Sequence, residues 1–395
     1  MQERFAPIDF EHFHAVVLPE RLAVRPETDV GGLRPIAFRM PDGAAYTYQP
    51  SGSSVAVEAG DAGASTVVEL DPRSWSDFVW ELRSSFSLLY GGDATFERGG
   101  MGDLAQWEPV LRAVLDGQAM YDLSAPPPLL DADGEPLALD RSFGLGDPDD
   151  EMRRFLEVAG FVHLRSVFDA EEIEALREVV CTAVARARPD DQRSWWTSVG
   201  SREVCNRVNY LNEQSELVAG LGSDPRMRRI ADLGGRKLRD ATDRLDGDSV
   251  VIKVPGAQTG LADLPWHRDC GMGGHPVMCP TLNVGIQLDA ASPANGQLLM
   301  IAGSHMGTSR LPTDEEAAGL PVAALHTQPG DVTAHFGHTL HSAPPPSDLR
   351  APGRRALYVT FVQPETFEMV GRGNGYNDVL FSRDAGRVPH VDDLR

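Results

Sequence analysis

The chain has 395 residues, of which 42% are hydrophobic, and 36 basic and 58 acidic side chains give it a net charge of −22. This length predicts two or three domains, and an acidic chain without a basic stripe is not expected to bind nucleic acid. The sequence has no apolar run of about 18 residues, so we expect no membrane span. It lacks the plan of a signal peptide at its start and any C-x-x-C pair, which together favour the cytoplasm.

Residues 1–121 predict a small α+β domain. Strands are expected at 36–39 and 46–48, on either side of the turn Pro41-Asp42-Gly43, and again at 55–57 and 66–70. A helix should begin after the capping residue Asp71 and run through Phe86 with an aromatic stripe on one face. A second helix is expected to end at Gly117.

The order of this sheet and its helices, with Gly99-Gly100-Met101-Gly102-Asp103 before the last helix, is similar to sterol-carrier-type lipid-binding domains. The resemblance implies an apolar pocket that helps to hold a lipid-like substrate. An alternative is that the aromatic stripe is core packed under the sheet. A dimerisation or lid module is a third interpretation.

Residues 122–150 are rich in Pro, Gly and Asp, which predicts a linker. Residues 151–366 then predict a second domain, followed by a C-terminal tail at 367–395. It should begin with a helix at 151–158 and a strand at 161–164, in which His163 is a strand residue. Asp169 and Glu172 predict a capping box for the next helix. Trp195, Trp196, Asn206 and Asn209 lie in a less regular segment that either lines a substrate mouth or packs.

Short strands separated by Gly, Pro and Asp turns dominate the second domain. They are expected at 249–254, 281–288, 297–301, 332–336 and 354–362. The strand at 281–288 alternates, with Thr281, Asn283 and Gln287 on its polar face. This pattern predicts an antiparallel double sheet of the jelly-roll type, a double-stranded β-helix with flanking helices.

Four residues within these strands and turns point to one chemistry. His267 and Asp269 form an H-x-D motif, and His341 follows at the end of a later strand. Two imidazoles and a carboxylate are the ligands of a facial iron(II) site with three open positions. Arg354 follows on the last strong strand, where its planar fork suits a carboxylate of a co-substrate.

Several residues compete for these roles. His335 and His338 compete with His341 for the third ligand position, and we interpret both as ordinary strand or turn histidines. Arg355 competes with Arg354, but it should point to the opposite face of the strand. Lys253 is either a second cationic contact for the co-substrate or a solvated lysine at a strand end. A second H-x-D motif at His390-Val391-Asp392 lies in a polar tail without a strand pattern.

The assembled motifs resemble the phytanoyl-CoA dioxygenase family of iron(II)- and 2-oxoglutarate-dependent oxygenases. The resemblance spans roughly residues 150–366, and its motifs are W-H-R-D at 266–269, L-D-A-A-S-P-A-N-G-Q-L at 288–298, G-S-H at 303–305, P-G-D-V at 329–332, T-L-H-S at 339–342 and R-R-A-L at 354–357. The chain departs from the family after His341, where Ser342, Ala343 and prolines replace the usual Gly-Ser pair and asparagine.

The resemblance implies that His267, Asp269 and His341 hold Fe(II) and that Arg354 binds the distal carboxylate of 2-oxoglutarate. It also implies a reaction with O2 that releases succinate and CO2 and hydroxylates a small molecule. We expect an apolar or natural-product-like substrate. Desaturation, epimerisation or ring closure would begin with the same hydrogen abstraction.

Two other functions stay open from the sequence. The first is a non-oxidative jelly-roll enzyme that uses another metal, although Arg354 would have no task there. The second is a lipid-binding or scaffolding protein with an inert oxygenase domain, against which the complete His267, Asp269 and His341 set argues. Release of succinate would separate both from the oxygenase.

Overall fold

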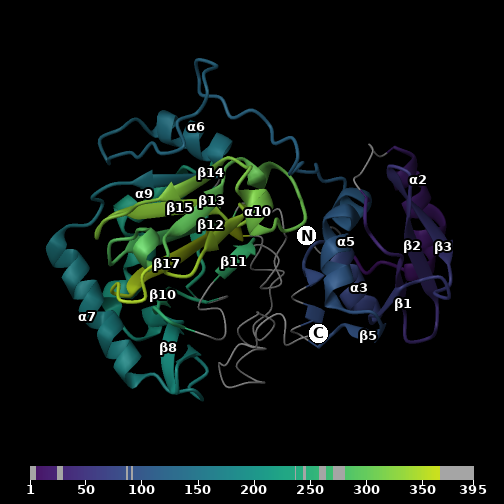
Figure 1. The fold of residues 1–395 in the computed structure, drawn as a ribbon, viewed down its shortest axis with the longest axis horizontal. Coiled ribbons are helices and arrows are strands. Elements are labelled where there is room, and N and C mark those ends of the chain that lie inside the picture. Colours follow the sequence, from purple (N-terminus) through teal and green to yellow (C-terminus); the bar gives the residue numbers. More distant parts are fainter. Residues whose placement is uncertain are drawn as a thin grey trace.

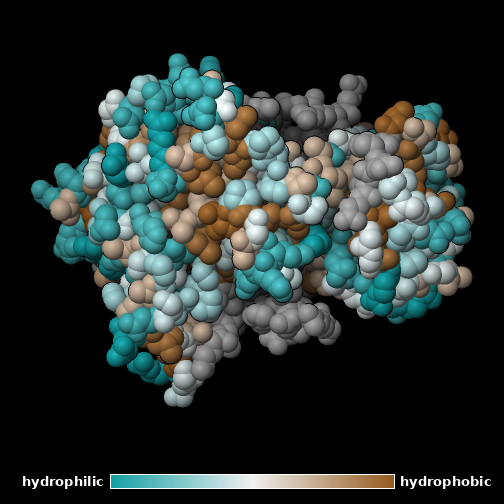
Figure 2. All heavy atoms as spheres, turned by 45° about the horizontal axis from the view of Figure 1, so that its top comes forward, coloured by the Kyte–Doolittle hydropathy of each residue, from teal (hydrophilic) through white to brown (hydrophobic). Residues whose placement is uncertain are grey.

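The computed structural model describes residues 6–24, 30–85, 88–89, 92–235, 237–242, 246–257, 264–269 and 281–364. Three sheets and their covering helices make up this part of the chain (Figure 1). Within it, no helix has the length and apolar composition that a bilayer crossing requires. Hydrophilic and hydrophobic residues are interspersed on the face drawn in Figure 2.

The N-terminal part holds a five-stranded sheet in the order β3-β2-β1-β4-β5. Its strands are β1 (Ile36–Arg39), β2 (Ala45–Ser51), β3 (Ser54–Ala59), β4 (Thr66–Glu69) and β5 (Thr95–Arg98). Its helices are α1 (Phe10–His12), α2 (Leu18–Ala23), α3 (Pro72–Val79) and α5 (Met101–Asp116), with a π-helical turn at Phe13–Val17. One apolar cluster, drawn from residues between Phe10 and Leu115, forms its core.

The N-terminal elements that the sequence predicted are present, with one error, whereas α1, α2 and β5 were not predicted. Asp71 caps α3 and Gly117 ends α5 with a φ of 80°, as expected. The prediction that the first of these helices runs through Phe86 is wrong, because α3 ends at Val79. Glu81 has a φ of 60°, a left-handed conformation that interrupts a right-handed helix.

Two antiparallel sheets form the rest of the described chain. The larger sheet has the order β6-β15-β12-β17-β10-β8-β7, with β9 paired to β17, and the smaller has the order β11-β16-β13-β14. Their strands are β6 (Phe161–Leu164), β7 (Ser194–Val199), β8 (Arg202–Val208), β9 (Arg239–Asp240), β10 (Ser249–Lys253), β11 (Leu264–His267), β12 (Leu282–Gln287), β13 (Leu298–Ile301), β14 (Val322–Leu325), β15 (Val332–Phe336), β16 (His341–Ala343) and β17 (Arg354–Val362).

Several helices of this region contact the larger sheet, and α7 lies along its outer side (Figure 1). They are α6 (Asp149–Ala159), α7 (Ala170–Arg186), α8 (Glu216–Ala219), α9 (Pro225–Asp232) and α10 (Asp314–Ala317), and short 3-10 helices lie at Leu211–Glu213, Leu221–Ser223, Pro293–Asn295 and Ser304–Met306. The capping box of Asp169 and Glu172 starts α7 as predicted. A second apolar cluster, drawn from residues between Phe143 and Phe361, is the core here.

The expectation of a less regular segment around Trp195 and Trp196 is wrong. Both residues lie in β7, which forms an antiparallel hairpin with β8 at the edge of the larger sheet. The register of this hairpin shifts between Trp195 and Trp196, and Asn206 is left unpaired opposite the shift. Such a bulge breaks the period-two alternation that a strand otherwise shows in its sequence.

The predicted linker and the residues just before it are hydrogen-bonded to the part of the chain that contains the two antiparallel sheets. The backbone of Tyr121 donates to Thr308 O over 2.8 Å, and Thr308 donates to Ala119 O over 2.8 Å. Further along, Phe143 and Arg165 form backbone hydrogen bonds that attach the segment to the edge at β6. These hydrogen bonds attach the segment from Gly117 to Pro148 near both of its ends, and we call this segment the strap.

Candidate metal centre

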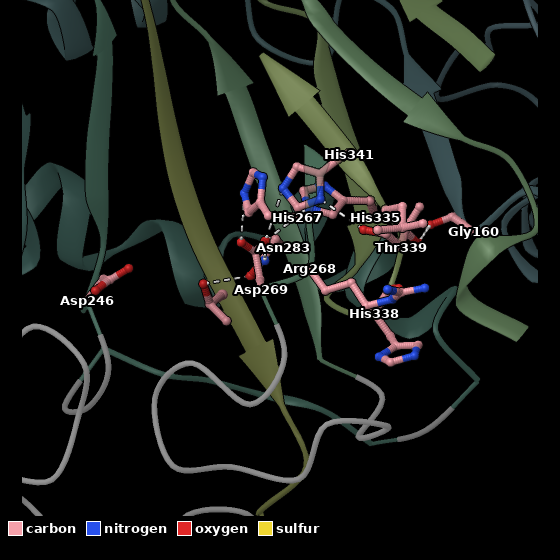
Figure 3. A network of polar contacts seen from close by, with 12 residues as sticks. Gly160, Asp246, His267, Arg268, Asp269, Asn283, His335, His338, Thr339 and His341 are labelled. Atoms are coloured by element: carbon pink, nitrogen blue, oxygen red, sulfur yellow. Dashed lines mark hydrogen bonds and ion pairs between the residues drawn. The ribbon is translucent and has the colours of Figure 1, made fainter. Parts of the chain in front are cut away.

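Two paired strands of the smaller sheet bring the predicted histidines together. His267 is the last residue of β11 and His341 the first of β16, and the two are register partners. Asp269 follows β11 by two residues, and its backbone N–H donates to Gly337 O over 2.8 Å. The turn before β16 therefore fixes the carboxylate beside both imidazoles (Figure 3).

The three side chains form a compact cluster of donor atoms. Nε2 of His267 lies 3.5 Å from Oδ1 of Asp269, and Nε2 of His341 lies 3.5 Å from Oδ2. One potential ligand atom from each residue lies within 4.8 Å of the others. Two imidazole nitrogens and one carboxylate oxygen are a donor set that fits iron(II).

Backbone carbonyls orient both imidazoles. Nδ1 of His267 donates to Pro265 O over 2.7 Å, and Nδ1 of His341 donates to Thr339 O over 2.9 Å. With the proton on Nδ1, the lone pair of a neutral imidazole is on Nε2. A carbonyl partner of this kind fixes the tautomer of metal-binding histidines, and here both Nε2 atoms face Asp269.

Burial and neighbouring charges hold His341 and Asp269 in the protonation states that can bind a metal. Burial, aided by the neighbouring His267, lowers the pKa of His341 to about 3. Burial opposes ionisation of Asp269, but His341, His267 and His335 hold the pKa of this carboxyl well below its usual value. Burial also disfavours the charged form of His267, but the hydrogen bond and charge of Asp269 raise its pKa. At neutral pH His341 is neutral and Asp269 ionised, as metal ligation requires.

The sequence did not predict the contacts of Asn283 and His335 with Asp269, or that of Thr360 with Asn283. Asn283 donates from Nδ2 to Oδ2 of Asp269 over 2.6 Å, and Thr360 donates to Oδ1 of Asn283 over 2.9 Å. His335, interpreted above as an ordinary strand histidine, has its Nε2 3.3 Å from the same Oδ2. The alternation of β12, which put Asn283 on the polar face, was the one signal in the sequence that could have suggested it.

The two arginines of β17 face opposite ways, as predicted. Arg355 forms an ion pair with Asp289, with Nε 2.8 Å from Oδ2 and Nη2 2.9 Å from Oδ1. Arg354 is 5% exposed and shares the inward face of β17 with Tyr358 and Thr360. Among the described residues its guanidinium has one hydrogen bond, from Nε to Gly296 O over 2.8 Å.

Lys253 is the register partner of Arg354 on β10. The interpretation of a solvated lysine at a strand end is wrong, because Lys253 is 3% exposed. Its Nζ donates to the backbone O of Ala343, the last residue of the strand that begins with His341. Burial of both cations on one side of the double sheet concentrates positive charge there, although burial itself lowers the pKa of Arg354.

The remaining candidates lie elsewhere. His338 points away from the cluster (Figure 3), and its Nε2 is 3.2 Å from Gly307 O. His163 lies on β6 as expected and pairs with Asp331 over 3.0 Å. The second H-x-D motif, at His390 to Asp392, lies outside the described residues.

Comparisons with known proteins agree with this geometry. The family model for phytanoyl-CoA dioxygenases matches residues 156–350. A protein of Stutzerimonas stutzeri, a probable alpha-ketoglutarate-dependent hypophosphite dioxygenase, is 27% identical over 273 residues, which are 62% of this chain and 90% of the relative.

Solved structures of similar proteins include AviO1 from Streptomyces viridochromogenes Tue57, which is 23% identical with a TM-score of 0.44 over 55% of this chain and 96% of its own. They also include EctD from S. alaskensis with 2-oxoglutarate and 5-hydroxyectoine, which is 19% identical with a TM-score of 0.47 over 58% of this chain and 81% of its own. The family match covers the elements that carry His267, Asp269 and His341. Residues 156–350 therefore form a domain of the phytanoyl-CoA dioxygenase family of iron(II)- and 2-oxoglutarate-dependent oxygenases.

Proposed function

We propose that the chain oxidises a C–H bond of a small molecule while 2-oxoglutarate is converted to succinate and CO2. The observation that carries the proposal is the cluster of His267, Asp269 and His341, whose ligand atoms lie within 4.8 Å of one another. This donor set leaves room on iron(II) for a co-substrate and O2.

Each residue of the site has a separate task in this proposal. His267, Asp269 and His341 hold Fe(II), and bound iron supplies the O2 activation that couples decarboxylation to oxidation of the substrate. Arg354 pairs through its planar fork with the distal carboxylate of 2-oxoglutarate. Lys253, buried beside it, adds a second positive charge. The contribution of the chain is to orient the reactants and exclude water.

We propose that the chain consists of a jelly-roll oxygenase domain preceded by a small α+β domain. Strands β10 to β17 alternate between the larger and the smaller sheet, except that β13 and β14 are both in the smaller one, and this order supports a double-stranded β-helix. The separate apolar clusters of the N-terminal and C-terminal parts support a boundary near residue 121. The strap overlaps most of the linker predicted at residues 122–150, and these domain bounds stay a prediction.

The substrate in this proposal is an apolar or natural-product-like molecule. This expectation came from the lipid pocket that the resemblance to sterol carriers implies for the N-terminal part. In that part, Trp75 and Phe78 are fully buried in the core. Packing under the sheet thus accounts for the aromatic stripe, and the resemblance to sterol carriers stays a prediction. The Stutzerimonas relative is named for hypophosphite, so a small anion belongs in the same substrate panel.

The test is release of succinate from 2-oxoglutarate by the iron-loaded protein under air, with a panel of apolar molecules, natural products and hypophosphite. Succinate formation that a panel member stimulates, together with an oxidised product of that member, supports the proposal. A non-oxidative enzyme would convert its substrate without succinate. A binding or scaffolding protein would release none, even after full loading with iron and 2-oxoglutarate.

A further inference from the structure

His335 lies beside the proposed metal ligands without being one of the cluster of three. It is on β15, where it is the register partner of Asn283 on β12. Its ring centroid is 4.6 Å from that of His341, and its side chain is 2% exposed. Figure 3 shows His335 gathered with His267 and His341 around Asp269. The register of two neighbouring strands therefore directs both Asn283 and His335 at Asp269.

The two side chains meet the same oxygen of Asp269. Nδ2 of Asn283 is 2.6 Å and Nε2 of His335 is 3.3 Å from Oδ2. An ionised carboxylate only accepts hydrogen bonds, so both nitrogens must donate. Two donors use the acceptor capacity of Oδ2, whereas Oδ1 accepts no hydrogen bond from either residue. Oδ1, which lies 3.5 Å from Nε2 of His267, is then the oxygen left for a metal.

The donor role places a proton on Nε2 of His335, so Nδ1 is the ring nitrogen that still needs a hydrogen-bond partner. In the described part of the chain, Nδ1 of His335 is buried and has no hydrogen-bond partner. Burying an imidazole nitrogen without a partner has a cost, whereas a phenylalanine of similar volume would avoid it. An imidazole at this place on β15 is therefore explained by its contact with Asp269, not by packing.

We propose that His335 is a positioning residue for the metal: with Asn283 it holds Oδ2 of Asp269, so that the carboxylate binds iron(II) through Oδ1 alone. This inference rests on the proposed function, because it takes Asp269 as a metal ligand. Partners of this kind orient a ligand and raise metal affinity, and their loss typically weakens binding by about 10- to 100-fold.

The test measures the affinity of the full-length, metal-free protein for Fe(II) under anaerobic conditions, by competition with a coloured chelator. His335→Phe should bind Fe(II) about 10-fold more weakly or worse. His335→Gln, whose amide can still donate, should bind more tightly than His335→Phe. His338→Phe is the matched control, since His338 is buried and close in the chain but faces Gly307, and it should bind as the wild type does. Thermal unfolding of each metal-free variant reports any loss of fold.

Wild-type affinity in His335→Phe, with affinity lost in Asp269→Ala, would overturn the positioning role and leave the proposed metal site intact. Wild-type affinity in Asp269→Ala would instead overturn the proposed site. Equal weakening in His335→Phe and His335→Gln would show that the donated hydrogen bond is not the cause. If His335→Phe does not fold, His335→Leu and His335→Gln provide the same comparison with a smaller side chain.

Discussion

Arg354 and Arg355 are consecutive on β17, yet only Arg355 forms an ion pair with Asp289. Because successive side chains of a strand point to opposite faces, Arg354 faces the side that carries Tyr358 and Thr360. Thr360 in turn contacts Asn283, the hydrogen-bond partner of Asp269. The inward face of β17 thus connects Arg354 with the metal cluster.

Replacing each arginine separately should show that Arg354 serves co-substrate binding and Arg355 serves stability. We predict that Arg354→Ala raises the Kd for 2-oxoglutarate about 30-fold or more, because losing one partner of a buried charge pair costs about 2 kcal/mol or more. Arg355→Ala should bind 2-oxoglutarate like the wild type and lose about 1 kcal/mol of stability with its ion pair. Calorimetry in the presence of iron, with urea unfolding, measures both. A larger binding defect in Arg355→Ala would reverse the assignment.

The strap packs closely against Gly307, so the methyl group of an alanine there should disturb the contact. A Cβ at Gly307 would lie 2.7 Å from the backbone N of Tyr121 and 2.8 Å from the carbonyl carbon of Met120. Tyr121 also joins the apolar cluster of Trp266 and Leu340, the residues directly before His267 and His341. The strap therefore contributes to the support of both proposed histidine ligands.

We predict that Gly307→Ala lowers the free energy of unfolding by about 1–3 kcal/mol, the usual cost of overpacking. The control is Gly319→Ala, where the nearest atom to a new Cβ is Glu316 O at 3.5 Å, an ordinary contact. Urea unfolding of the two variants gives the comparison. Equal stabilities would mean that the strap can move away from Gly307 at little cost.

Asp248 should make stability depend on pH. It is 1% exposed, and burial, with the neighbouring charge of Asp240, raises the pKa of its carboxyl to about 7. Between about pH 4 and 7 the folded protein keeps this proton while the unfolded chain has lost it, so stability falls as pH rises through this window. The total loss is at most about 4 kcal/mol, from a shift of about three pH units.

Asp248→Asn keeps the shape but cannot ionise. Its stability relative to the wild type should therefore increase from pH 4 to pH 7 and stay constant above that. Urea unfolding of the metal-free proteins at pH 5 and pH 8 tests this. A constant difference between the two proteins at both values would contradict the raised pKa.

The sequence was sufficient to predict the residues that meet at the candidate site, because local signals coincide there. His267 and Asp269 form an H-x-D motif between the β-branched strand at 249–253 and the alternating strand at 282–287, and His341 follows the Pro-Gly-Asp turn. The expectation that His341 ends a strand is wrong, because it is the first residue of β16. The capping box at Asp169 and the glycine at 117 follow from local hydrogen-bond and backbone preferences. Such features depend on few residues and need no knowledge of the tertiary structure.

Features set by tertiary contacts were not predictable. Lys253 looks like a solvated strand end in sequence, but its burial depends on Ala343 and Gly296, which are distant in the chain. His335 takes its role from strand register, which places it beside Asn283. The hairpin of β7 and β8 was missed because a bulge interrupts its alternation.

The most direct test of the central claim is an anaerobic titration of Fe(II) and 2-oxoglutarate into the metal-free protein, followed by the weak visible band that the pair gives when bound together. We expect a band in the wild type and in His338→Phe, no band in His267→Ala or Asp269→Ala, and a band in Arg354→Ala only at much higher 2-oxoglutarate. Absence of the band in the wild type, or its persistence in both His267→Ala and Asp269→Ala, would contradict the assignment of this cluster as the iron site.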